Sequence, residues 1–287
     1  PGESLYGASE AGFVSVMLGS TAGLVPVSAS GIRQEDLGST SETGDRFGEV
    51  LSAGDFDGDG FTDLAISAPS EDLTGAVDTG FVWVVYGAAY GLETSGRERL
   101  TQKRARSRRE NGDGFGAAMA TGDLDGDGIP ELITVSNLAE PDQNELLQPI
   151  AFYYYWDGER FSERAGSVLN LSGGRSFVRG HNFVLLDYDG DMDQELAVSL
   201  GSPLREIVIL DLNDEGEWVV IQTVKPNGMR SGVGAIYVTA VDWNRDGFDE
   251  IIVLSPEGDV LRTQPFYNIG SELVMGDGQD TPIPGLD

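Results

Sequence analysis

The segment DFDGDGFTD, residues 55–63, carries the strongest chemical signal because it holds four carboxylates in nine residues. Carboxylates this close repel one another by about 1 kcal/mol per pair even in water, so a cation is expected among them. The acids occupy positions 1, 3, 5 and 9, and glycines at positions 4 and 6 let the backbone curl around one point. A flexible shell of about six to eight oxygens suits Ca²⁺. The segment therefore predicts a calcium-binding loop.

The pattern recurs as DLDGDGIPE (123–131), DYDGDMDQE (187–195) and DWNRDGFDE (242–250). Its opening is shared with EF-hand loops, but the closing acid arrives earlier and the flanks LSAG and LAISAP read as strands, which argues against an EF-hand. Loop three has Met192 where the turn favours glycine, and Arg245 brings a positive charge to loop four. The predicted ligands of up to four Ca²⁺ ions, with backbone carbonyls from Phe61, Ile129 and Phe248, are Asp55, Asp57, Asp59, Phe61, Asp63, Asp123, Asp125, Asp127, Ile129, Glu131, Asp187, Asp189, Asp191, Asp193, Glu195, Asp242, Asn244, Asp246, Phe248 and Glu250.

Composition narrows the class of protein. The formal net charge is −30, which argues against nucleic acid or an anionic membrane as a partner, and no apolar run approaches the length of a membrane span. Cysteine is absent, so thiols give no evidence on the compartment. Calcium modules of low affinity need the calcium levels found outside the cell, which favours a secreted or cell-surface protein. The chain opens with PGESLYG in mid-repeat, so we expect any signal peptide to lie upstream.

The loops belong to a longer repeat. TGDRFGEVLSAG before the first loop matches NGDGFGAAMATG before the second at an offset of 68 residues, and the chain start matches the segment after loop one at the same offset. Each unit reads as four short β-strands, which favours an all-β propeller of four-stranded antiparallel blades over two sandwiches. One domain, 1–287, is expected to comprise a half blade (1–40), blades at 41–108, 109–172, 173–228 and 229–270, and the start of a further blade or a closure (271–287).

The segment RFGEVLSAGDFDGDGFTDLAISAP, residues 46–69, resembles the FG-GAP repeat of integrin α-subunit propellers and their bacterial relatives. Phe47-Gly48 supplies the FG, and blade two keeps Phe115-Gly116, whereas blades three and four match mainly in their loops. The resemblance implies Ca²⁺ between the first and second strands of each blade and ligand recognition by loops on the opposite face. It also implies seven blades in an intact protein, with Asp287 as the first ligand of another loop.

The basic segment RERLTQKRARSRRE, residues 97–110, precedes blade two and is expected on the face opposite the calcium loops. Its Arg104, Arg106, Arg108 and Arg109 are candidate contacts for a sulfated or uronate glycan or an acidic protein. The alternative is a solvated loop or a tether to the protein's own acidic surface.

The sequence is compatible with three classes of function. The leading prediction is an extracellular, calcium-stabilised adhesion or ligand-binding module for a protein or glycan. The second is the propeller of a calcium-dependent polysaccharide-active enzyme, or the accessory propeller of an enzyme whose catalytic domain lies elsewhere. The third is a structural subunit of a surface filament. His181 is the only histidine and has no evident catalytic partner, so catalysis by this chain is not expected.

Overall fold

The structure is a computed structural model of the 287-residue chain. It describes residues 9–21, 23–102, 111–136, 150–168, 183–191, 193–200, 206–213, 215–227, 236–257, 260–270 and 272–282. These residues form antiparallel strands and one short 3-10 helix, η1 (Gln34–Leu37). None of their helices is long and apolar enough to cross a membrane.

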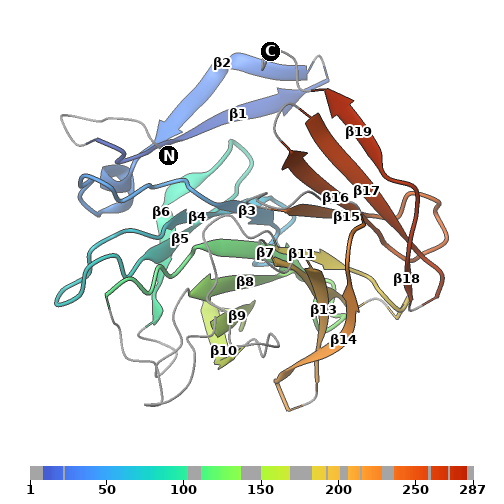
Figure 1. Ribbon diagram of the computed structural model, residues 1–287. Coiled ribbons are helices and arrows are strands. Elements are labelled where there is room, and N and C mark those ends of the chain that lie inside the picture. Colours follow the sequence, from blue (N-terminus) through green and yellow to red (C-terminus); the bar gives the residue numbers. More distant parts are fainter. Residues whose placement is uncertain are drawn as a thin grey trace.

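The strands form five sheets, or blades, arranged around a common centre (Figure 1). The first holds β1 (Val14–Ser20) and β2 (Gly23–Ile32). Blade one holds β3 (Leu51–Gly54), β4 (Asp63–Ala68), β5 (Phe81–Tyr86) and β6 (Glu93–Leu100). Blade two holds β7 (Ala118–Gly122), β8 (Glu131–Ser136), β9 (Ile150–Trp156) and β10 (Phe161–Val168). Blade three holds β11 (Phe183–Leu186), β12 (Glu195–Leu200), β13 (Glu206–Leu212) and β14 (Trp218–Val224). Blade four holds β15 (Tyr237–Val241), β16 (Glu250–Glu257), β17 (Val260–Asn268), β18 (Leu273–Met275) and β19 (Gln279–Pro282).

The first strand of each of these four blades lies innermost, where β3 contacts β7, β7 contacts β11 and β11 contacts β15 (Figure 1). Apolar side chains from facing blades form four core clusters, one at each junction between consecutive sheets. The strands β8 and β12 are buried at every position, because each is covered on both faces. Runs of apolar residues without polar alternation therefore fold here as the middle strands of stacked blades.

The Phe-Gly pairs sit at the junctions between blades. Phe115 is fully buried, and its backbone N–H donates to the carbonyl of Thr79 at 2.8 Å. A Cβ on Gly80 would lie 2.3 Å from the Phe115 carbonyl oxygen, and Gly80 has a φ of +75°. Phe47 and Gly12 repeat the arrangement one blade earlier, with a corresponding distance of 2.1 Å. The repeat keeps glycine here because the backbones of adjacent blades come too close for any side chain.

A buried acidic pair joins blade one to the helix after the first sheet. Glu71 accepts a hydrogen bond from the Gln34 side chain of η1 at 2.8 Å and shares another with the carboxyl group of Asp45. The three side chains are almost wholly inaccessible to solvent. Burial, followed by repulsion from Asp45, raises the pKa of Glu71 to about 8. At neutral pH the pair therefore retains a proton.

The predicted all-β propeller of four-stranded antiparallel blades is confirmed, but the blade count differs in detail from the expectation. The described residues form five sheets, of which the first holds two strands, fewer than the seven blades that the resemblance implies for an intact protein. Both β18 and β19 pair with β17, so together they supply the outer strand of blade four. Residues 273–282 thus extend the last sheet instead of opening a further blade. Asp287 lies outside the described residues.

Candidate metal centres

Each acidic loop connects the first and second strands of a blade: β3 to β4, β7 to β8, β11 to β12 and β15 to β16. Consecutive loops lie next to one another, as the pairs Gly58 and Ile129, Asp123 and Gln194, and Asp187 and Asp249 show, so the four loops emerge at the same end of the propeller. Gly58 and Gly60 adopt φ values of +71° and +89°, and Gly126 and Gly128 repeat these values closely in loop two. Glycine favours this left-handed conformation because it has no Cβ, which explains the D-x-D-G-D-G pattern.

The closing acids share one geometry. Asp63, Glu131, Glu195 and Glu250 are each at most 3% exposed. Each accepts a hydrogen bond of 2.7 to 2.8 Å from the backbone N–H of the second residue of its own loop. Burial raises the pKa of Asp63 to about 6 and the pKa of Glu131 and Glu195 to about 8. A buried acid in this position holds the loop backbone in place and is well placed to bind a cation.

In loop one, carboxylate oxygens of Asp55, Asp57 and Asp63 lie within 4.8 Å of one another. Asp59 is not part of this group, and one of its oxygens accepts a hydrogen bond from the Phe61 N–H at 2.8 Å. In loop two the acids brought together are Asp123, Asp125 and Asp127, while Glu131 stays outside the cluster. Two loops thus gather three of their four predicted carboxylates.

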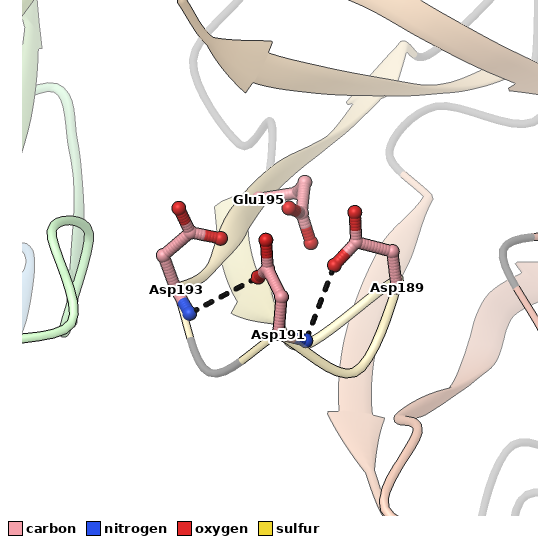
Figure 2. Close-up of side chains that lie close together, drawn as sticks. All are labelled: Asp189, Asp191, Asp193 and Glu195. Atoms are coloured by element: carbon pink, nitrogen blue, oxygen red, sulfur yellow. Dashed lines mark hydrogen bonds between the residues drawn. The ribbon is translucent and has the colours of Figure 1, made fainter.

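Loop three gathers the largest group. Figure 2 shows the carboxyl groups of Asp189, Asp191, Asp193 and Glu195 converging, with oxygens within 4.8 Å of one another. A hydrogen bond to Asp191, assisted by burial, raises the pKa of Asp193 to about 7. Asp187 lies outside the group and binds the loop backbone instead, accepting from Gly190 at 2.6 Å. Met192 lies outside the described residues.

Loop four is arranged differently. The amide nitrogen of Asn244 donates to Glu250 at 2.8 Å and to Asp246 at 2.9 Å, and Asp242 accepts from the backbone of Asp246. Arg245 replaces the glycine of the other loops and has a φ of +64°. The described residues of loop four therefore hold their acids with an amide instead of gathering three carboxylates.

The donors fit a hard cation. One carboxylate oxygen of Asp55 is buried and accepts no hydrogen bond, although it lies beside the carboxylates of Asp57 and Asp63. A buried charged oxygen without a partner is costly, and a cation would compensate it. The oxygens brought together are those of carboxylates in a glycine-containing turn, and carboxylates are ligands that Ca²⁺ accepts.

Neighbouring loops are also connected, which the sequence did not indicate. The backbone N–H of Asp123 donates to the side chain of Gln194 at 3.1 Å, and that of Asp187 donates to Asp249 at 3.0 Å. In both pairs the eighth residue of one loop holds the first residue of the preceding loop. The eighth position carries Thr, Pro, Gln and Asp in the four loops, so its residue types gave no repeating signal.

The basic segment is described only in part. Arg104, Arg106, Arg108 and Arg109 lie outside the described residues, as does His181. Arg97 donates to the carbonyls of Leu37 and Thr94, both at 2.6 Å, and its guanidinium lies 5.8 Å from the ring centroid of Trp83. Arg97 is thus engaged within the protein itself.

The fold is a β-propeller whose four larger blades carry an acidic loop between their first and second strands. Residues 47–85 match the family model of the FG-GAP repeat, which confirms the resemblance drawn from the sequence. The matched segment runs from the buried Phe47 through the first acidic loop to β5.

Among curated proteins, the chain is similar to phosphatidylinositol-glycan-specific phospholipase D. The mouse (Mus musculus) protein is 31% identical over 140 residues, which cover 48% of this chain and 16% of that protein. The rat (Rattus norvegicus) protein is 31% identical over 156 residues, which cover 53% of this chain and 18% of that protein. The matched region is therefore less than a fifth of either relative.

Among solved structures, a lectin of Agrocybe aegerita specific for non-reducing terminal N-acetylglucosamine aligns over 95% of this chain and 74% of its own, with 12% identity and a TM-score of 0.47. A rhamnogalacturonan lyase of Bacillus licheniformis aligns over 82% of this chain and 53% of its own, with 14% identity and a TM-score of 0.42. Similarity at this level assigns no function.

Proposed function

We propose that the chain is a calcium-stabilised β-propeller that acts outside the cell as an adhesion or ligand-binding module for a protein or glycan. The observation that carries the calcium step is the unpartnered, buried oxygen of Asp55 beside the carboxylates of Asp57 and Asp63. Loops two and three repeat the convergence, and loop four would join them once the Asn244 side chain presents its oxygen. Bound Ca²⁺ would neutralise carboxylates that otherwise repel one another within each loop.

Calcium would act on the fold because each loop fixes the start of a second strand. An ion that binds only the folded state stabilises it by about 2.7 kcal/mol per site at a hundredfold excess over its dissociation constant. Removal of Ca²⁺ with EDTA should therefore lower the melting temperature by many degrees, and Ca²⁺ should restore it better than Mg²⁺ does. Identical melting curves with and without chelator would refute the calcium step.

The ligand step rests on the basic segment. Replacing Arg104, Arg106, Arg108 and Arg109 by Ser should abolish binding to acidic glycans on an array while the number of bound Ca²⁺ ions stays constant. The reason is that the segment precedes the first strand of blade two in the sequence whereas the loop follows it, so we expect the two toward opposite ends of that strand. Binding that persists in the quadruple variant would leave the segment as a solvated loop or tether.

A second candidate function is that of an accessory propeller in a larger enzyme. It is favoured by the relatives, which are named as phospholipases and of which the matched region is less than a fifth. Assay of the chain for hydrolysis of glycosylphosphatidylinositol distinguishes the roles: an accessory propeller has no activity alone but changes that of a catalytic domain when joined to it.

A further inference from the structure

The solvent exposure of the second residue of each acidic loop shows whether the next blade covers that blade. Phe56, Leu124 and Tyr188 occupy this position in blades one to three, and they are 0%, 7% and 6% exposed. Each belongs to the core cluster that its blade forms with the following blade. Trp243 occupies the same position in blade four and is 65% exposed. The largest apolar side chain of the four is therefore the one left in solvent.

The strands of blade four give the same result independently. Ala65, Ile133 and Ala197 lie ten residues after the start of their loops and are fully buried, whereas the equivalent Ile252 is only half-buried. On β17, Phe266 is buried against blade three while the neighbouring Tyr267 is 47% exposed. Blade four thus alternates between a covered face and an uncovered apolar face, unlike β8 and β12.

Two cavities adjoin partly uncovered apolar surfaces, one on blade four and one between the first sheet and blade one. One of about 660 Å³ is lined by Trp243, Ile252, Pro265, Tyr267 and Met275 of blade four. The other, of about 320 Å³, lies between the first sheet and blade one.

The lining of this second cavity includes Met17 of β1, Ala53 of β3 and Leu64 of β4. Nearby on β3, Leu51 is 48% exposed. Among the described residues, β15 and β3 make no contact as extensive as those that join β3 to β7, β7 to β11 and β11 to β15.

We propose that this junction binds a two-stranded antiparallel hairpin of the same kind as β3, its acidic loop and β4. Such a pair covers the equivalent face at every other junction, so the stacking that joins blades one to four would continue across the gap. Apolar side chains on one face of the hairpin would contact Trp243 and Tyr267, and those on its other face would contact Leu51. Its second strand would extend the first sheet beside β1, as β4 does beside β5, which is recognition by strand addition.

The occupant is specified by its chemistry. Its first strand needs small and apolar residues, as in LSAG (51–54), and its second strand needs apolar residues on both faces, as in DLAISA (63–68). A basic amphipathic helix or a flat glycan meets neither requirement. The inference concerns the blade junction and does not depend on the proposed calcium or ligand-binding function.

The test uses a synthetic peptide with the sequence of residues 47–68, added to the full chain in Ca²⁺. Titration calorimetry should detect binding, and acrylamide should quench Trp243 less in the complex. Trp243→Asp and Tyr267→Asp should each weaken the peptide at least tenfold. Because Trp243 is itself part of loop four, the Tyr267 variant on β17 separates loss of the surface from disturbance of the loop. The matched control, Val220→Asp, changes an apolar residue 41% exposed on β14, the outer strand of blade three, and should bind as the parent does.

Three results would overturn the proposal. One is the absence of binding with unchanged quenching of Trp243. Another is equal affinity for a peptide carrying Ile66→Pro, which cannot form the second strand. The third is sedimentation showing that the parent chain dimerises and that Tyr267→Asp makes it monomeric, since a second copy would then occupy the surface.

Discussion

A carboxylate oxygen of Asp249 in loop four accepts the backbone N–H of Asp187 in loop three at 3.0 Å, and the N–H of Asp249 donates to the carbonyl of Asp187 at 2.9 Å. This reciprocal pair joins the first residue of one candidate metal loop to the eighth residue of the next. The two loops therefore cannot shift independently.

Asp249→Ala should lower the free energy of unfolding by about 1 to 2 kcal/mol, because a hydrogen bond to a charged acceptor is lost at a half-buried site. Asp249→Asn keeps an acceptor oxygen and should lose clearly less. Urea unfolding measures both variants. Equal losses in the two would mean that the charge, not the hydrogen bond, matters.

Gly80→Ala should be strongly destabilising. A left-handed φ costs a non-glycine residue about 1 to 2 kcal/mol, and the new Cβ would also overlap the backbone of Phe115. The matched control is Gly75→Ala, because Gly75 has a φ of +92° and no atom lies within 4 Å of the place its Cβ would take. The difference between the two variants in urea unfolding isolates the close approach of the blades. If both lose equally, the inter-blade contact has no special role.

Arg245→Gly should stabilise the protein by about 1 kcal/mol, since Arg245 holds the left-handed φ that glycine holds in the other loops. Loop four should also bind a cation more tightly once the guanidinium is gone. The reciprocal change, Gly126→Arg in loop two, should cost a similar amount, because Gly126 has space around its Cβ position. Thermal melts with and without Ca²⁺ check both. A destabilised Arg245→Gly would contradict the strain argument.

The stability of the metal-free protein should fall as pH rises from about 4.5 to about 8. The pKa of Glu71 is 4.5 in an unstructured peptide and about 8 in the fold, so within this window the folded chain binds more protons than the unfolded chain. The free energy of unfolding then decreases with pH. Glu71→Gln should reduce the slope but not abolish it, because the raised pKa values of Asp63, Glu131 and Glu195 act in the same sense, while the exposed Glu159→Gln should leave the slope unchanged. Urea unfolding at several pH values tests this, and an unaltered slope in Glu71→Gln would refute it.

The repeat made much of the fold predictable. Four loops with acids at positions 1, 3, 5 and 9, except for Asn244 in the fourth, and an offset of 68 residues between the first two repeats led to the blades and to their first and second strands. Residues that recur at the same position of each repeat indicate local structure, because every repeat folds into the same strands and loop. The assignment of individual metal ligands stays a prediction.

Features that depend on residues from two blades were not predictable. Gln194 and Asp249 play one role with different side chains, so their position carried no pattern. The pairing of both β18 and β19 with β17 was missed, because Gly276 and Gly278 interrupt what reads as a single weak segment. The outward-facing Trp243 looked like its buried counterparts, since sequence shows that a residue is apolar but not what covers it.

The hydrogen bond from the second residue of each loop to the closing acid has a mechanical consequence. In the first three loops the side chain of that second residue packs against the next blade while its N–H donates to the closing acid of the loop. A pulling force applied to the two ends of the chain would therefore act on each loop through the blade against which its second residue packs. The propeller would yield one blade at a time, and the calcium concentration would set the force at which each blade gives way.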